Sequence, residues 1–290
     1  KFSEDGVETY SDIMLGLPLE TSKSYIDGIL ELVDSNIDEF SMPQTIVLKG
    51  TPMEMDDYIE TYGIETKPRV IPESLGHYGS KGEFVAEFEN MIYKTSTMPY
   101  SDYLLCRKFN LIIMIWHNTR LLKPVYEYQE KILGKPRSEL LEKIFRVSLD
   151  YPGLNNFFDE YVKLNTSELL ESEQIPKDSE VEDLTANKIY KFLGRAFIYH
   201  REDLLNIFLQ VIGELNYTKD AKELFHKLFD VIFFRDFSSD RIEVSLDIPK
   251  QFSSIFVDHS KINIRISKFQ SERLDDLVKI NDLATECRVP

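Results

Sequence analysis

The sequence predicts an α/β segment followed by a mostly helical region, so that the chain is mixed in class and mostly helical by residue count. The α/β segment is indicated by the order strand, short loop, helix and strand within residues 11–53. The helical region is indicated by apolar residues that recur at three- and four-residue spacing from residue 97 onward.

The α/β segment begins with the apolar run Ile13–Leu15, which stops at Gly16 and is expected to form a strand. Pro18 then fixes a turn, and Thr21 or Ser22 can cap a helix. The apolar face of that helix consists of Ile26, Ile29, Leu30 and Val33. A second strand is expected from Ile37 to Val47. Strands joined through a helix in this way are parallel.

Residues 54–98 are predicted to be partly extended. Asp56–Tyr62 can form a short helix that ends at Gly63. Residues 66–95 alternate extended runs with glycines, which predicts a loop and one or two short strands.

The helical region is expected to contain six helices. They are predicted over residues 97–116, 119–133, 138–149, 154–170, 183–215 and 218–234, with an acidic linker, Glu171–Glu182, before the last two. Apolar alternation predicts two strands at residues 241–248 and 262–266, which could pair. The stripe Phe225, Phe229, Phe233 and Phe234 is most simply core.

Two motifs carry a resemblance to a known superfamily. Asp12–Thr21, DIMLGLPLET, resembles the fifth strand and following turn of radical S-adenosylmethionine (SAM) enzymes. Gln44, followed by Leu48–Met53, resembles the sixth strand and exit loop of the same barrel. Arg69–Ser74, Thr95–Met98, Asp102–Tyr103 and Arg107 extend the likeness to about Asn118. This longer run is similar to the radical SAM proteins that carry a cobalamin-binding domain.

The resemblance implies the C-terminal strands of a partial (βα)6 radical SAM barrel, which is TIM-like, plus a helical C-terminal domain. The corresponding boundaries are residues 1–62 for the barrel end, 63–98 for an extended connection, and 99–290 for the helical domain with its small strand pair.

The resemblance also implies which residues bind ligands. Met14, Gly16 and Gln44 would contact SAM, since ligands of parallel barrels lie at the C-terminal ends of the strands. The alternative is that Ile13–Leu15 is core and that the glycine and proline only make a tight turn. Tyr103 and Arg107 lie one helical turn apart and would bind substrate. For Arg107 the alternative is a structural pair with Asp102 or another carboxylate.

The chain departs from the family in two respects. Such enzymes hold a [4Fe–4S] cluster on three closely spaced cysteines, whereas this chain has only Cys106 and Cys287. Leu19 also stands where the family has the second glycine of its turn. We therefore expect a C-terminal fragment that is inactive alone and needs the missing N-terminal part of the barrel as its partner. SAM, the cluster and, as an open question, cobalamin are expected in the parent enzyme.

Composition excludes several other classes of function. The net charge of −16 disfavours nucleic acid and anionic membranes as partners. Two cysteines give no disulfide framework and favour the cytoplasm. The five histidines show no metal-binding spacing, and no phosphate-binding glycine loop is present.

Two functions remain as hypotheses. In the first, the parent cleaves SAM to a 5′-deoxyadenosyl radical and carries out a methyl transfer or a rearrangement on a small-molecule substrate, with the helical domain covering the site. In the second, the chain is a non-catalytic helical binding module with a barrel remnant.

Overall fold

The computed structural model describes residues 7–78, 80, 82–173, 188–234, 242–244 and 262–264. The described chain is mixed α/β and mostly helical, as predicted. Its residues group into two compact units, each built from separate segments. Unit 1 comprises residues 1–32, 39–111 and 158–188, and unit 2 comprises residues 33–38, 112–157 and 189–290. The boundaries at residues 62 and 98 that the sequence suggests stay predictions.

Unit 1 opens with the predicted parallel strand pair. Strand β1 (Tyr10–Asp12) pairs in parallel with β2 (Glu39–Ser41), and helix α1 (Ser22–Asp34) connects them. The backbone N–H groups of Thr21 and Ser24 each donate to the hydroxyl of the other residue, which caps α1.

The predicted strand at Ile13–Leu15 is wrong in position, because the regular strand ends at Asp12. Single hydrogen bonds continue the pairing: Leu15 N–H donates to the Pro43 carbonyl at 2.9 Å, and Thr45 N–H donates to the Leu15 carbonyl at 2.9 Å. Pro43 has no N–H, so the ladder is interrupted there and only an isolated bridge joins Leu15 to Gln44.

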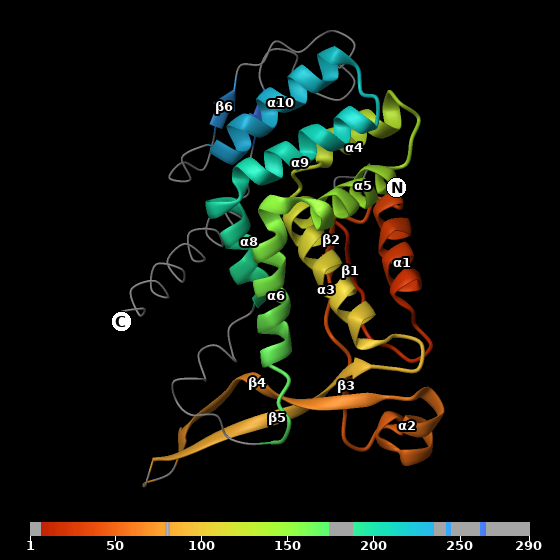
Figure 1. Ribbon diagram of the computed structural model, residues 1–290, viewed down its shortest axis with the longest axis vertical. Helices are drawn as coiled ribbons and strands as arrows, with labels where there is room; N and C mark the ends of the chain where they lie inside the picture. The colour runs from red at the N-terminus through yellow and green to blue at the C-terminus, as the bar shows by residue number, and fades with distance from the viewer. Residues whose placement is uncertain are drawn as a thin grey trace. The chain divides into compact units, whose positions relative to one another are not determined.

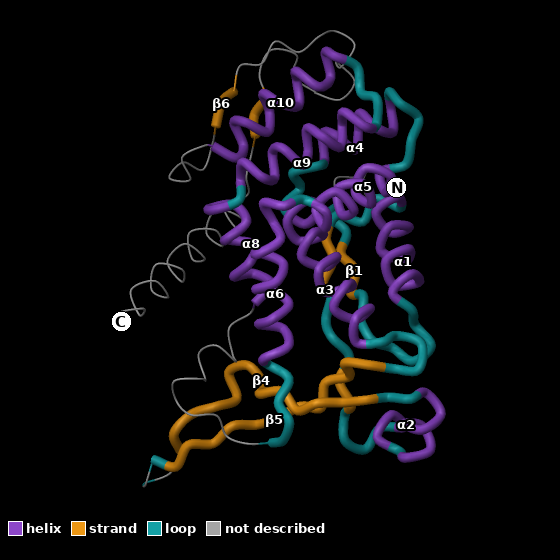
Figure 2. The backbone as a smooth tube through the Cα atoms, viewed as in Figure 1, coloured by secondary structure: helices purple, strands orange, loops and turns teal. Residues whose placement is uncertain are grey.

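An antiparallel sheet of three strands replaces the predicted loop and short strands. Its order is β3 (Ile46–Val47), β5 (Glu83–Lys94) and β4 (Glu65–Tyr78), and β4 and β5 form a long hairpin (Figure 2). The predicted strand from Ile37 to Val47 is therefore wrong as one element, since β2 and β3 belong to different sheets. The full length of β4 could not be predicted from the sequence, because prolines are rare inside strands. Pro68 lies in an edge strand, where no N–H is required, and the register shifts between Val70 and Leu75, around Pro72.

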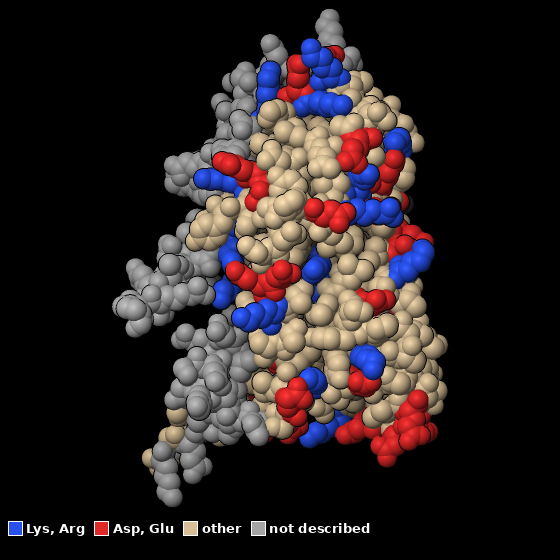
Figure 3. All heavy atoms as spheres, in the orientation of Figure 1, with Lys and Arg blue, Asp and Glu red and all other residues tan. Residues whose placement is uncertain are grey.

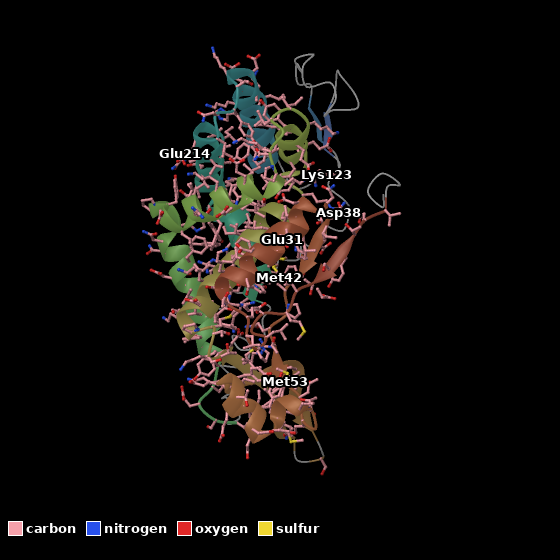
Figure 4. All side chains as sticks on the ribbon, turned by 90° about the vertical axis from the view of Figure 1, so that its right-hand side faces the viewer. Glu31, Asp38, Met42, Met53, Lys123 and Glu214 are labelled. Carbon is pink, nitrogen blue, oxygen red and sulfur yellow. The ribbon has the colours of Figure 1, made fainter. Side chains whose placement is uncertain are left out.

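Between β3 and β4, both in the three-stranded sheet, the chain forms η1 (Pro52–Glu54) and the predicted helix α2 (Asp56–Tyr62), which ends at Gly63. Figure 4 labels Met42, which directly follows β2, and Met53, which lies in η1. The first turn of α2 carries Asp56 and Asp57, and acidic side chains gather on the surface there (Figure 3).

Two further helices complete unit 1. Helix α3 (Tyr100–Ile113) lies beside α1 (Figure 1), because Ser22 donates to Asp102 at 2.7 Å and Tyr25 donates to Asn110 at 3.0 Å. Helix α6 (Asn155–Ser167) reaches α3 through Tyr100 and Thr166, whose hydroxyls are 2.9 Å apart.

Unit 2 is built around aromatic packing. After the π-helical turn η2 (Met114–Asn118) its elements are α4 (Lys123–Lys131), α5 (Arg137–Asp150), η3 (Pro152–Leu154), α8 (Lys188–Tyr199), α9 (Arg201–Glu214) and α10 (Lys219–Phe234). The first residue of α8, Lys188, groups with unit 1. The buried Trp116 ring stacks on Phe208 and Phe229 with centroids 6.2 Å away in each case. Phe225 is also buried, so the first half of the predicted phenylalanine stripe is core.

Two predictions that were made from apolar periodicity, both in the C-terminal part of the chain, have different outcomes. The single helix predicted over residues 183–215 is wrong, because α8 ends at Tyr199 and α9 begins at Arg201. His200 leaves helical geometry with a ψ of 15° and contacts Asp203 at 3.0 Å. The predicted pairing of the last two strands is confirmed: β6 (Ile242–Val244) pairs with β7 (Ile262–Ile264), in the antiparallel direction. Most of the predicted acidic linker and Cys287 lie outside the described residues.

Among the described helices, none combines the length and the apolar run that a membrane crossing requires.

Candidate functional site

The turn that follows β1 is closed by its own glutamate and by a distant threonine. Gly16 N–H donates to the Glu20 carboxylate at 3.0 Å, and burial raises the pKa of Glu20. The Thr97 hydroxyl donates to the Glu20 carbonyl at 2.7 Å. The two segments that carry the family resemblance, Asp12–Thr21 and Thr95–Met98, therefore meet in unit 1.

Leu19 keeps the backbone conformation that a glycine would favour. Its φ is +66°, in the left-handed region, and its side chain is 66% exposed. The left-handed conformation costs an L-residue with a Cβ roughly 1–2 kcal/mol. Leu19 therefore holds a left-handed backbone conformation under strain, where a glycine would hold it without strain.

We expect Leu19→Gly to raise the free energy of unfolding by about 1 kcal/mol, because glycine adopts this φ without strain and no buried contact is lost. Urea unfolding would measure the change. Leu19→Val is the matched comparison and should lower stability, since a β-branched residue fits the left-handed region worse. Equal stability of the two variants would contradict the strain argument.

The predicted SAM-contacting residues lie together after the ends of the two parallel strands. The Leu15 side chain is fully buried, whereas Met14 is 42% exposed. Gly16 has a φ of +95°, and an added Cβ would lie 3.6 Å from the Ile92 carbonyl oxygen. Gln44 is opposite Leu15 in the isolated bridge. Met14, Gly16 and Gln44 thus share one end of the β1–β2 pair, and Leu15 has the core role that the alternative assigned to this run.

The Gln44 side chain links the cofactor candidates to the substrate candidates. Its Oε1 accepts a hydrogen bond from Arg69 Nη1 at 2.6 Å, and its Nε2 donates to the Tyr103 hydroxyl. Both ends of the amide are therefore fixed. Burial raises the pKa of Tyr103 to about 12, so this phenol keeps its proton at neutral pH.

Arg107 lies one helical turn beyond Tyr103 and is 7% exposed. Its Nε and Nη2 donate to Asn165 Oδ1 at 3.0 and 2.8 Å. The alternative pairing of Arg107 with Asp102 is wrong, because the described residues show no ion pair between them, and Asp102 accepts from Ser22. Burial by itself would lower the pKa of Arg107, but the neighbours of the guanidinium, Glu168 among them, raise it, so the carboxylate that acts on Arg107 is Glu168.

Sequence reasoning missed four charged residues of this cluster. Arg69 donates through Nε to Glu89 at 2.8 Å, and its Nη1 is 3.8 Å from Glu168. Lys188 Nζ is 2.6 Å from Glu168, and the side chains of both are less than a tenth exposed. Arg69 lies in a segment that carried the resemblance. The sequence around Glu168 and around Lys188 does not indicate that either side chain is buried, because the two partners are 20 residues apart in the chain.

The described residues do not fit an iron–sulfur cluster. Burial raises the pKa of the Cys106 thiol to about 12, and a cluster requires thiolates. The described part of the chain contains no group of three or more metal-ligating side chains. For SAM the fit is better. Gly16 allows close backbone approach, Met14 presents an exposed side chain, and the nearby Thr45 hydroxyl is buried without a hydrogen-bond partner among the described residues.

The comparisons agree with the class that these motifs indicate: the chain is similar to cobalamin-dependent radical SAM proteins. One curated relative is the cobalamin-dependent radical SAM methyltransferase TokK of Streptomyces tokunonensis, 28% identical over 163 residues, which are 54% of this chain and 21% of that protein. Another is the 2-(S-pantetheinyl)-carbapenam-3-carboxylate methyltransferase of Streptantibioticus cattleyicolor, 25% identical over 175 residues, which are 57% of this chain and 25% of that protein. The matches thus span a quarter or less of each relative. No protein-family model matches the chain.

Proposed function

We propose that this chain is the C-terminal part of a radical SAM enzyme that transfers a methyl group with the help of cobalamin. The observation that carries the proposal is the parallel β1–β2 pair, which brings Met14, Gly16 and Gln44 to one end. Ligands of parallel α/β sheets bind at that end of the strands. The names of the two relatives support methyl transfer over rearrangement, and one of them supports cobalamin dependence.

The same strand pair supports a place in a larger barrel. Parallel strands occur in sheets of several strands that are covered on both faces, and a pair alone is poorly stable. Val7, Tyr10 and Met14 leave apolar side chains 51%, 58% and 42% exposed along β1 and its extension. We propose that β1 and β2 are the last strands of a (βα)6 barrel, and that the N-terminal part of the barrel pairs with and covers them.

The residues of this chain would bind and orient ligands in that enzyme. Gly16 and Met14 would line the SAM site, and the Gln44 amide, fixed by Arg69 and Tyr103, would form a rigid wall beside them. SAM supplies the methyl group and the adenosyl radical when bound. Tyr103 and Arg107 would face the substrate. The iron–sulfur cluster and cobalamin would be held by other parts of the parent enzyme, because the described residues offer no ligands for the cluster.

The intact mass and N-terminal sequence of the protein isolated from its own cells test this proposal. We expect a longer chain with three closely spaced cysteines upstream. After anaerobic reconstitution, that protein should cleave SAM to 5′-deoxyadenosine. A native protein without such cysteines would contradict the proposal and would favour the non-catalytic binding module.

A glycine pair tests the SAM site within the same enzyme. Gly16→Ala should raise the KM for SAM about tenfold or more, because the added methyl narrows a site where backbone must approach the ligand. Gly50→Ala is the matched control: its φ is also positive, at +81°, but an added Cβ there meets no atom within 4 Å. Equal effects of the two substitutions would show that backbone strain, and not ligand contact, is responsible.

A further inference from the structure

The Gln44 amide has two chemically different ends, and its neighbours decide which end faces which way. A guanidinium only donates hydrogen bonds, so the atom that faces Arg69 Nη1 at 2.6 Å has to be the carbonyl oxygen Oε1. The Tyr103 hydroxyl sets no such condition, because a phenol both donates and accepts. It accepts from Nε2, the end of the amide that does not face Arg69. The orientation of the amide is therefore determined by Arg69 and only accepted by Tyr103.

Arg69 can determine this orientation because its own guanidinium is held by other residues. It lies directly opposite Glu89 in the register of β4 and β5, and both its Nε, at 2.8 Å, and its Nη2 contact the same Glu89 oxygen. Nη1, the nitrogen that donates to Gln44, also lies 3.8 Å from Glu168. The side chains of Arg69 and Glu89 are 16% and 15% exposed. A lysine could not make these contacts together, since an ammonium lacks the planar fork of an arginine.

This orientation leaves Gln44 with a hydrogen-bond donor that a ligand can use. Nε2 carries two hydrogens, and the Tyr103 hydroxyl takes one of them. Oε1 is already bound to a cation, and hydrogen bonds in a chain polarise one another, which strengthens Nε2–H as a donor. Gln44 is half-buried and lies opposite Leu15, at the strand end that also carries Met14 and Gly16.

We propose that Arg69 is a positioning residue, which holds Oε1 of Gln44 so that this amide donates its second Nε2 hydrogen to an acceptor atom of the bound ligand. Arg69 acts through Gln44 and does not itself contact the ligand. The direction of the amide selects the chemistry of the ligand, because an acceptor gains a hydrogen bond there and a donor meets another donor. The proposal rests on the proposed function only where it calls the ligand SAM or the methyl-accepting substrate.

Hydrogen exchange of the Gln44 side-chain amide, followed by NMR on the isotope-labelled 290-residue chain, tests the orientation. We expect Arg69→Lys to speed this exchange about tenfold, because lysine can keep the ion pair with Glu89 but releases Oε1, and the amide can then turn over. Arg146→Lys, which makes the same change in an exposed ion pair with Glu142, is the matched control and should leave the rate unchanged. Equal rates in wild type and Arg69→Lys would overturn the proposal.

The backbone amide of Leu170 separates an effect on Gln44 from damage to strand β4. This N–H donates to the Pro68 carbonyl at 2.8 Å, one residue from Arg69, so its exchange reports whether the strand keeps its contacts. We expect Arg69→Lys to leave the Leu170 rate as in wild type. Faster exchange of Leu170 together with Gln44 would show that the substitution acts through the strand, and this result would count against Arg69 as a positioning residue.

The variant Gln44→Glu, made in the longer enzyme, removes the donor and keeps the contact with Arg69. A carboxylate still accepts from the guanidinium but has no N–H. The KM of the ligand that Nε2 contacts should rise about tenfold with kcat little changed, and Arg69→Lys should raise the same KM. A rise confined to SAM identifies SAM as that ligand, and a rise confined to the methyl-accepting substrate identifies the substrate. Unchanged KM values for both in Gln44→Glu would refute the role of the amide as a donor.

The exchange and kinetic measurements can fail separately. A longer enzyme that does not cleave SAM would refute the proposed function. The exchange rates of Gln44 and Leu170, measured on the 290-residue chain, would still decide whether Arg69 sets the orientation of the amide.

Discussion

Glu168→Leu should lower the free energy of unfolding by about 3–5 kcal/mol at neutral pH, because it leaves Lys188 buried without its partner. The pair is close, at 2.6 Å, and Lys188 is 4% exposed. Arg69 and Arg107 also lower the pKa of Lys188, after the larger effect of burial, so the stranded ammonium would lie among cations.

The sign of the pH dependence follows from the direction of that shift. In the variant, the folded pKa of Lys188 lies below its unfolded value of 10.5, so the native state binds fewer protons. The stability deficit should therefore shrink as the pH rises toward 10.5. Urea unfolding between pH 7 and pH 10 would measure it.

The double variant Glu168→Leu with Lys188→Met is the control. It removes one charge of each sign and leaves no ammonium buried without its carboxylate, so its stability should lie within about 1–2 kcal/mol of wild type. A double variant as unstable as Glu168→Leu would show that packing, and not the stranded charge, sets the cost.

Acid should destabilise unit 2 through His117. This side chain is buried, its Nε2 is 2.9 Å from the Ile37 carbonyl oxygen, and its Nδ1 is 3.3 Å from the Tyr126 hydroxyl. Since a carbonyl only accepts, Nε2 carries the proton of the neutral ring and Nδ1 accepts from the tyrosine. Burial lowers the pKa of His117 to about 4, and Arg137 and Arg120 act in the same direction, whereas the Ile37 carbonyl and Asp38 oppose it.

The folded pKa of His117 lies below its unfolded value of 6.5. The unfolded chain therefore binds more protons between these values, and stability falls as the pH drops from 6.5 to about 4. The loss attributable to His117 should reach about 3 kcal/mol. His117→Gln keeps a donor for the Ile37 carbonyl but cannot titrate. The stability difference between wild type and this variant, measured by urea unfolding at several pH values, should therefore change by that amount. A constant difference would contradict the assignment.

Local signals in the sequence predicted the elements whose boundaries depend on local chemistry. The cap at Thr21, the stop at Gly63 and the apolar periodicity of α3 and α10 are each visible within a few residues. The long β4–β5 hairpin was not predicted, because Pro68 and Pro72 are tolerated only through an edge position and a register shift, and both depend on the partner strand. The break at His200 was also missed, since neither proline nor glycine marks it.

The residues of the candidate site also fall into two groups, those that the sequence could indicate and those that it could not. Gly16 and Gln44 stand in motifs and could be singled out, and so could the pair Tyr103 and Arg107. The residues that hold them, Arg69, Asn165 and Glu168, come from segments up to 124 positions from Gln44. Ordinary surface residues have the same identities, and only tertiary contacts bury these particular ones.

The interleaving of the two units constrains how the protein can be made. Residues 33–38 group with unit 2, while residues 158–188 return to unit 1 after a long stretch of unit 2. During synthesis, Arg69 and Arg107 therefore emerge well before Glu168 and Lys188 can join them. The charged interior of unit 1 therefore cannot form until residue 188 has left the ribosome. For the same reason, no single cut in the gene separates one unit from the other.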